Sequence, residues 1–383
     1  MRLEPAIPAA VLGAVRAPFL EARATALDAP IVQPLGLFLD FAGETLRERL
    51  FVVQGSNGEE SCLRPDFTLP AVRAHIDSGA PGGRYLYEGH VFRVAPRGAA
   101  RAEEFLQIGL EVFETLSDLG EPAVSDAHMA ALAWRAAAAG GRDDLILMLG
   151  DVGLFGAFIE TLGLAGPLTA RLKRAFQSPR RLRLELEAAA SGTPVPARDG
   201  DRLAGLLGDL SEAEATAVLE EIWALAGIEP VGGRSAGEIV HRLAERAALA
   251  KAPSLGREQA EMITRFLAIA DAPAAALAAV AELAGPASPA LETALRAWRQ
   301  RLEGLAKAGV PADRTRLSTA FGRTFGYYDG MLFEVRSAAL PRDAPVAAGG
   351  RYDSVPARLG AAHAVGALGS MVRPGRAWSE GWP

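Results

Sequence analysis

The sequence predicts an α+β protein in which one sheet domain is built from both ends of the chain and is split by a helical insert. Segments near both ends alternate between apolar and polar residues with a period of two, which is typical of strands with two unlike faces. The middle of the chain instead shows alanine, leucine, glutamate and arginine at helical spacing. We therefore expect a split sheet domain at 1–120 and 311–383, with a mostly helical continuation and insert at 121–310.

The N-terminal block is expected to begin with a helix, which is followed by turns and strands. Its clearest strand signals are 85–93 and 105–113, and both alternate. The loop between them is rich in proline, glycine and arginine. The pattern predicts an antiparallel pair joined by a long loop.

The segment 105–113 predicts a strand with one polar face. Its apolar face carries Leu106, Ile108, Leu110 and Val112. The other face carries Gln107 and Glu111 on either side of Gly109, and a glycine inside a strand often marks close approach by a ligand or another backbone. Gln107 and Glu111 are therefore candidates for a polar floor under a small molecule with amino or imidazole groups. A strand with one solvated face is the alternative.

The rest of the chain predicts fewer strands. One strand is expected at 145–149, within the helical middle. The last block predicts a strand at 327–335, a glycine turn at 349–350 and an apolar helix near 363–373.

Composition excludes several classes of function. The formal net charge is −6, and the densest basic block, at 171–183, is more typical of a solvated helix face than of a nucleic-acid site. Cys62 is the only cysteine, so an intrachain disulfide and a thiolate-rich metal site are excluded. The five histidines are scattered and no phosphate-binding loop of the GxxxxGK[ST] type is present, so we expect no metal and no cofactor.

The location expected from the sequence is the cytoplasm. Glu4, Pro5 and Pro8 interrupt the short apolar run at the N-terminus, which does not match a signal peptide. No run of 18 uncharged apolar residues is present, so no membrane association is expected.

Five segments together resemble the ordered motifs of histidyl-tRNA synthetase catalytic cores. They are CLRPDFTLPAVRAHI (62–76), YEGHVFRVAPRGAARAEEFLQIGLEVFE (87–114), GRTFGYYDGMLFEV (322–335), AAGGRYD (347–353) and AVGALGSMVR (364–373). The resemblance implies a class II aminoacyl-tRNA synthetase-like core with a mostly antiparallel sheet flanked by helices. It also implies a dimer formed through a segment that includes PIVQP (30–34).

The resemblance also implies a pocket for histidine or a similar amino acid. Asp66, Thr68 and Gln107 would hold the α-amino group, while Glu111 and the pair Tyr327 and Tyr328 would lie near the imidazole. If the pair sits on a strand, only one of the two tyrosines can face the pocket.

Two arginines complete the implied pocket. Arg93 would meet a nucleotide phosphate, and Arg323 would lie on the carboxylate or phosphate side. Simpler roles remain open, because Arg323 could form a salt bridge within the core and Asp66 could cap a helix.

The departures from the synthetase pattern bear on catalysis. The family's Arg-x-Glu reads Arg93-Val94-Ala95 here, Val372 stands where an acidic residue normally precedes the motif arginine, and Gly326 replaces an aspartate. Only ten residues follow Arg373, so the anticodon-binding domain of a synthetase is not expected. Adenylation requires preorganised charge at the α-phosphate and at the metal ion. The loss of two acidic positions there is therefore not expected of a fully active synthetase.

These departures are similar to those of a paralogous family, the regulatory subunits of the short-form ATP phosphoribosyltransferase of histidine biosynthesis. The segment 149–164 also resembles that family. The resemblance implies a non-catalytic subunit that works with a separate short catalytic subunit, binds no tRNA and possibly binds histidine. The alternatives are a synthetase-like enzyme that activates histidine or a related amino acid, and a stand-alone amino-acid sensor.

Overall fold

The computed structural model describes residues 2–380 with gaps, and the structural statements below concern these residues. Within that range the residues left out are 43, 56–57, 97, 100, 116–120, 193–204, 207–209, 227–235, 238, 242, 245–252, 287 and 323–325.

The helices and strands follow one another along the chain in three stretches. The first holds α1 (Ala9–Leu20), β1 (Thr25–Ala26), β2 (Val32–Pro34), α2 (Leu35–Ala42), the 3₁₀ helix η1 (Glu44–Arg49), β3 (Val52–Gln54), β4 (Glu60–Leu63), α3 (Thr68–Ser78), β5 (Gly83–Phe92) and β6 (Glu104–Thr115). The second holds α4 (Pro122–Ala138), β7 (Leu145–Asp151), α5 (Val152–Thr161), α6 (Gly166–Phe176), α7 (Pro179–Ser191), α9 (Glu212–Ala226) and α11 (Arg257–Leu267). The third holds β8 (Ala270–Asp271), α12 (Pro273–Ala284), α13 (Pro289–Lys307), η2 (Ala312–Arg314), β9 (Thr315–Ser318), β10 (Met331–Ser337), β11 (Ala347–Arg351), α14 (Ser354–Arg358), β12 (Val365–Val372) and α15 (Pro374–Ala377).

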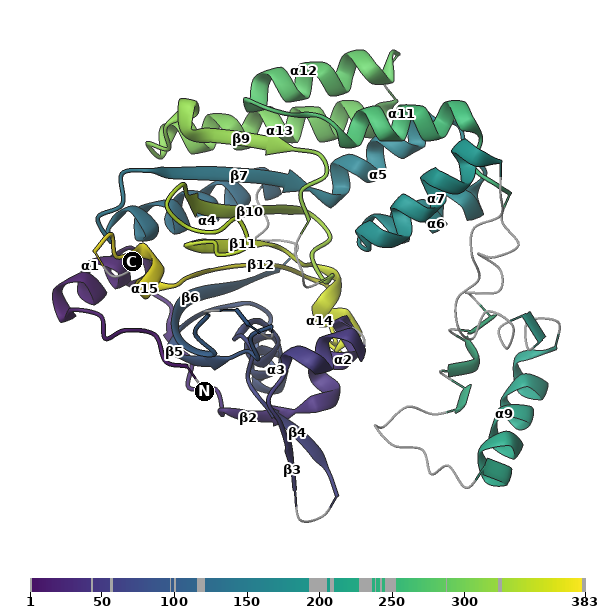
Figure 1. Cartoon of the computed structure of the whole chain (residues 1–383), viewed down its shortest axis with the longest axis horizontal. Helices are drawn as coiled ribbons and strands as arrows, with labels where there is room; N and C mark the ends of the chain where they lie inside the picture. Colours follow the sequence, from purple (N-terminus) through teal and green to yellow (C-terminus); the bar gives the residue numbers. More distant parts are fainter. Residues whose placement is uncertain are drawn as a thin grey trace. The chain divides into compact units, whose positions relative to one another are not determined.

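Nine strands form one sheet in the order β1-β5-β6-β12-β11-β10-β7-β9-β8 (Figure 1). All neighbours from β5 to β7 in this order are antiparallel, and only β1 with β5 and β7 with β9 are parallel. This confirms the α+β class and the mostly antiparallel sheet. Strands β2, β4 and β3 form a second, small antiparallel sheet.

The expected antiparallel pair is confirmed as β5 and β6, the long strands beside the middle of the sheet. Gly89 is the partner of Gln107, Tyr87 of Gly109, and Tyr85 of Glu111. Since directly opposite residues point to the same face, these side chains lie on one side of the sheet.

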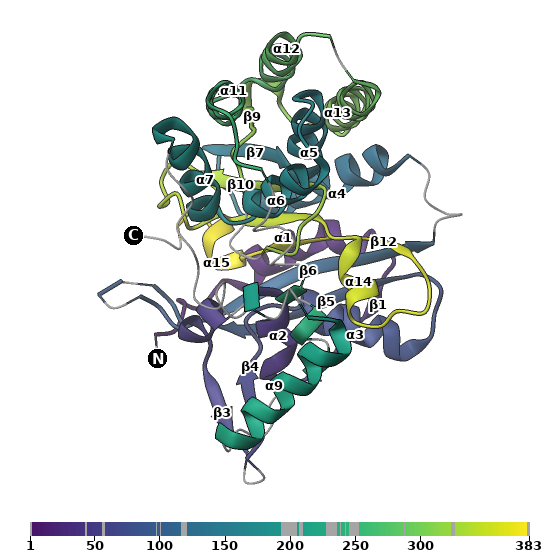
Figure 2. The ribbon, with the colours of Figure 1, turned by 90° about the vertical axis from the view of Figure 1, so that its right-hand side faces the viewer.

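Helices cover both faces of this sheet (Figure 2). Helix α4 packs on β10, β11 and β12 and is flanked by α1 and α13. Helix α3 packs against β6, where His75 stacks on Phe113 with ring centroids 4.3 Å apart. Because Phe113 and Glu111 share a face of β6, α3 lies on the side of the candidate pocket.

Three expectations for the C-terminal block are wrong. The strand expected at 327–335 begins only at Met331, so the tyrosine pair precedes it. The expected turn at Gly349 and Gly350 is the middle of β11, and the expected helix near 363–373 is β12. The helix prediction failed because a short apolar run does not distinguish a buried strand from a buried helix. The turn prediction failed because the glycines of β11 serve another purpose: the strands on both sides approach them too closely for a side chain.

The chain divides into two compact units. The sheet unit contains 1–154 and 267–383, and the helical unit runs from Phe155 to Phe266. The segments 121–154 and 267–310, which we expected within the helical middle, belong to the sheet unit, and the expected strand at 145–149 is confirmed as part of β7. In the helical unit, Phe158 stacks on Phe266 with ring centroids 4.4 Å apart.

Among the residues that the structure describes, no helix combines the length and apolar character needed to cross a bilayer.

Candidate functional site

Glu111 is the centre of a buried cluster of hydroxyl groups. Its side chain lies on β6 and is 1% exposed. Thr68 Oγ1 donates to Glu111 Oε1 at 2.9 Å, and the Tyr87 hydroxyl reaches the same oxygen at 3.5 Å. The Tyr352 hydroxyl donates to the other oxygen, Oε2. Three elements, α3, β5 and the end of β11, therefore supply donors to one carboxylate.

Burial determines the protonation of Glu111. Removal from water raises the pKa of this carboxyl from 4.5 to about 8, because the charged form loses its hydration. Hydrogen bonds from Tyr352, Thr68 and Tyr87 oppose this shift, and the nearby charge of Asp66 adds to it. The Glu111 carboxyl is consequently protonated below about pH 8, and a bound cation would favour release of that proton.

Tyr327 and Tyr328 both lie in this cluster. They sit in the turn before β10 and are both buried, so the strand alternation from which we expected only one of them to face the pocket does not apply to them. Tyr327 is hydrogen-bonded to Thr68. Its ring centroid lies 4.8 Å from that of Tyr328 and 6.0 Å from that of Tyr352.

Asp66 immediately precedes the first turn of α3. The N-cap position of this helix is Phe67, so Asp66 is not the N-cap residue. Asp66 is buried, and its charge raises the pKa of Tyr87 and of Tyr327 as well as that of Glu111. The carboxylate therefore lies close to the same hydroxyls.

Gln107 presents a buried amide to the same face of β6. It is 0% exposed, and neither its oxygen nor its nitrogen has a hydrogen-bond partner among the described residues. An unsatisfied buried amide costs about 1–3 kcal/mol, so this position favours a bound group that both donates and accepts.

Glycines make room for the cluster. A Cβ at Gly369 would overlap the Glu111 carboxylate, and one at Gly109 would overlap the Tyr87 hydroxyl. Gly369 on β12 is the pairing partner of Glu111 on β6. The Glu111 carboxylate therefore lies against the backbone of the neighbouring strand, where a side chain on Gly369 would block it.

Sequence reasoning placed Tyr87 on a strand without assigning it to the site, and it missed Tyr352 altogether. The signal was present in the Gly-Gly-Arg-Tyr-Asp motif, from which we singled out only the glycines. The preceding Arg351 is buried and donates from Nε to Asp126 Oδ1 on α4 at 2.8 Å. Asp126 also accepts from Arg301 on α13 at 2.9 Å, so buried ion pairs fix the strand end that carries Tyr352.

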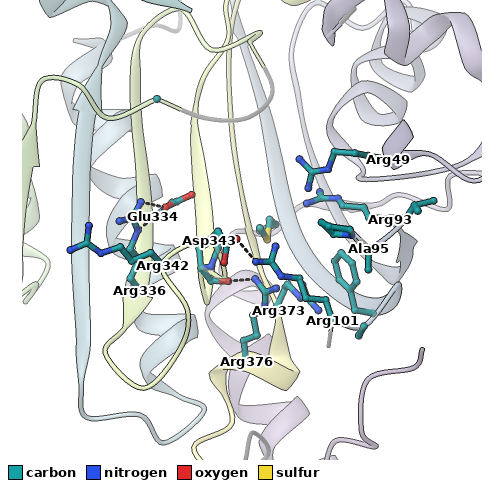
Figure 3. Close-up of a pocket in the computed structure, with 17 residues that line it drawn as sticks. Arg49, Arg93, Ala95, Arg101, Glu334, Arg336, Arg342, Asp343, Arg373 and Arg376 are labelled. Carbon is teal, nitrogen blue, oxygen red and sulfur yellow. Dashed lines mark hydrogen bonds and ion pairs between the residues drawn. The ribbon is translucent and has the colours of Figure 1, made fainter. Parts of the chain in front are cut away.

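Arg93 lies apart from this cluster. Its Nε donates to Pro65 O at 2.8 Å, which ties the segment before α3 to the end of β5. Arg93 also lines a separate cavity of about 370 Å³ beside Phe105 and Ala95 (Figure 3). Arg323, the remaining candidate, is outside the described residues.

Arginines dominate the lining of this cavity (Figure 3). They are Arg49, Arg93, Arg101, Arg336, Arg342, Arg373 and Arg376. The lining carboxylates are Glu334 and Asp343. The cavity therefore has an excess of positive charge, although the molecule as a whole is acidic.

No group of three or more histidine, cysteine, aspartate or glutamate side chains with metal-binding geometry occurs in the described part of the chain.

Comparison with known proteins identifies the family. A family model described as "Histidyl-tRNA synthetase" matches residues 27–227 and 215–371. ATP phosphoribosyltransferase regulatory subunits match over nearly the whole chain. The one from Brucella anthropi is 34% identical over 369 residues, which is 94% of each protein. The one from Agrobacterium fabrum is 37% identical over 357 residues, covering 92% of this chain and 91% of the relative.

Solved structures show the same fold at lower identity. A protein from Bacillus halodurans described as an ATP phosphoribosyltransferase regulatory subunit/histidyl-tRNA synthetase has a TM-score of 0.61 and 18% identity, covering 96% of this chain and 77% of its own. A histidyl-tRNA synthetase from Nostoc has a TM-score of 0.59 and 17% identity, covering 97% and 72%. With its class II synthetase-like sheet and its relatives at 34–37% identity, the chain belongs to the family of ATP phosphoribosyltransferase regulatory subunits.

Proposed function

We propose that this chain is a non-catalytic regulatory subunit that works with a separate, short-form ATP phosphoribosyltransferase catalytic subunit in the first step of histidine biosynthesis. The observation that carries the proposal is the 34–37% identity to proteins of that name over more than nine tenths of the chain. We place the complex in the cytoplasm, without tRNA or membrane as a partner.

The arginine-lined cavity supports the absence of adenylation by this chain. Ala95 lines it at the position where the synthetase pattern has a carboxylate. Val372, at the other expected acidic position, is fully buried in β12 and brings no charge. The alternative, an enzyme that activates histidine, requires histidine-dependent pyrophosphate exchange above background.

The Glu111 cluster supports a histidine-like ligand. Glu111 and Asp66 offer negative charge to an ammonium or imidazolium group, and Gln107 offers an unsatisfied amide. We assign the ligand site to Asp66, Thr68, Gln107, Glu111, Tyr327 and Tyr328, with Arg93 and Arg323 toward the cavity. Histidine bound here would carry the feedback signal.

The small sheet supports self-association as a dimer. Val32 on β2 and Val53 on β3 are 51% and 40% exposed, and Ile31 beside them is 48% exposed. Val32 lies on β2 and Val53 on β3, and these two strands flank β4 in the small sheet. An exposed apolar surface of this kind is typical of an interface, and it includes the PIVQP segment.

The central test mixes the purified chain with a purified short catalytic subunit and follows phosphoribosyl-ATP formation. The catalytic subunit should be active only with this chain, and the chain alone should make no product. Equal activity with and without the chain would contradict the proposal.

A calorimetric titration with histidine tests the ligand site. Glu111→Ala should weaken binding about tenfold to a hundredfold, because a hydrogen bond to a charged group contributes roughly 1.5–3 kcal/mol. Glu114→Ala, three residues further along β6 on the other face, is the matched control and should bind like wild type. Equal binding by both variants would make Glu111 a structural residue.

A further inference from the structure

A second cavity, of about 320 Å³, lies on the face of the sheet opposite to the Glu111 cluster. Strand β6 presents Leu110 and Val112 to this cavity, whereas Glu111 between them points to the other face. The first turns of α4 and the segment after α1 complete the walls. No described lining residue is shared with the arginine-lined cavity, so the two are separate.

The floor of this second cavity is apolar. It is formed by Leu110 and Val112 on β6, Leu368 on β12 and Met129 on α4, each of which is at most 6% exposed. Leu368 is the pairing partner of Val112, so neighbouring strands present one continuous apolar surface. Because removal of apolar groups from water is favourable, this floor suits the hydrocarbon part of a small molecule.

Two opposite charges lie side by side at the edge of the floor. Arg84 on β5 is the pairing partner of Val112, and Glu114 is the next residue on the same face of β6. Such diagonal neighbours are about 7–8 Å apart, within reach of long side chains. Neither side chain has a hydrogen-bond or ion-pair partner among the described residues. An exposed ion pair between them would contribute little, so a ligand could engage both charges at small cost.

The other lining carboxylate is already engaged. Glu121, at the start of α4, accepts a hydrogen bond from Gln300 on α13. One guanidinium group and one carboxylate therefore remain beside the apolar floor. A guanidinium group binds a carboxylate with two parallel hydrogen bonds, and Glu114 would accept hydrogen bonds from an ammonium group. An α-amino acid carries both of these groups on one carbon atom, which matches two neighbouring charges of opposite sign.

We propose that this cavity binds an α-amino acid with an apolar side chain, of the size of leucine or phenylalanine. The carboxylate of the ligand lies on Arg84, its ammonium group on Glu114, and its side chain over Val112 and Leu368. The thioether of Met129 suits either an aliphatic side chain or an aromatic ring. This site is distinct from the histidine pocket proposed above and does not depend on it or on the catalytic partner.

Calorimetry on the full chain with L-phenylalanine, L-leucine, L-alanine and 3-phenylpropionate tests the proposal. Phenylalanine and leucine should bind. Alanine should bind at least about tenfold more weakly, because it lacks the side chain that the floor would bury. 3-Phenylpropionate lacks the ammonium group and should also bind at least about tenfold more weakly than phenylalanine.

Variants of the two charged residues identify the site. Arg84→Gln and Glu114→Gln should each weaken phenylalanine binding about tenfold to a hundredfold, because each removes a charged partner of the ligand. Arg180→Gln is the matched control and should bind like wild type. Arg180 is an exposed arginine on α7 that does not line the cavity and has no side-chain partner in the described structure.

The proposal is overturned if neither leucine nor phenylalanine binds measurably. Equal affinity of wild type and Arg84→Gln for phenylalanine would also overturn it, because the amino acid would then bind elsewhere on the chain. Alanine binding as tightly as phenylalanine would show that the apolar floor is not used, and this too would contradict the proposed site.

Discussion

Replacing Glu111 with glutamine should change how the stability of this protein depends on pH. The folded protein holds the Glu111 proton more tightly than the unfolded chain, because burial raises the pKa of this carboxyl from 4.5 to about 8. Between pH 4.5 and about pH 8 the folded state binds more protons than the unfolded state. The stabilising contribution of protonated Glu111 is therefore fully present below about pH 4.5. It is lost progressively as the pH rises to about 8.

The magnitude follows from the separation of the two pKa values. One pKa unit corresponds to about 1.4 kcal/mol, so the separation between 4.5 and about 8 corresponds to about 5 kcal/mol. The glutamine side chain does not titrate and can still accept hydrogen bonds from Tyr352 and Thr68. The wild type should therefore lose about 5 kcal/mol of unfolding free energy relative to Glu111→Gln between pH 4.5 and pH 8.

Urea unfolding of the two proteins at half-unit steps from pH 4.5 to pH 8.5 measures this difference. Glu114→Gln, a change in the less buried end of the same strand, should show no such pH-dependent difference from wild type. A difference that stays constant with pH would refute the reasoning. A difference of the opposite sign would show that the three hydroxyl donors outweigh burial and hold the carboxylate ionised.

Three further predictions address other parts of the structure. Tyr352→Phe removes a donor to the buried carboxylate and should lower the unfolding free energy by about 1–3 kcal/mol, as measured by urea unfolding. Gly369→Ala should lower the unfolding free energy, because its Cβ would push the Glu111 carboxylate away from its hydroxyl donors, whereas Gly166→Ala, with open space around it, should unfold like wild type in urea. Val32→Arg should shift the protein from dimer to monomer in sedimentation velocity while leaving its near-ultraviolet spectrum unchanged; a monomeric wild type would contradict the proposed interface.

The sequence predicted the polar face of β6 because the two faces of this strand have different surroundings, and such a strand shows period-two alternation. Gln107 and Glu111 do share a face, and both are buried. The same reasoning failed at β11 and β12, whose residues are buried on both faces and therefore lack alternation. Tyr352 was missed for a different reason: the Gly-Gly-Arg-Tyr-Asp motif contains it, but periodicity does not indicate that the end of β11 reaches Glu111 across β12.

Other features depended on long-range contacts that local patterns do not contain. The partner of Arg373 is Glu4, near the opposite end of the sequence, and Asp343 at the cavity is paired with Arg101 from a distant segment. The resemblance to the synthetase motifs supplied the class II core with its mostly antiparallel sheet, which periodicity alone did not predict.

The position of β12 has a consequence for the synthesis of this protein. Strand β12, the last strand among the described residues, inserts between β6 and β11, and about 250 residues separate Thr115 from its pairing partner Val365. At about 5–20 residues per second, a ribosome needs roughly 10–50 s to make that stretch. During this time β6 presents an unpaired edge to the cell. The nascent sheet unit is therefore exposed to aggregation until β12 emerges, and its yield in cells should depend on chaperones that shield unpaired strands.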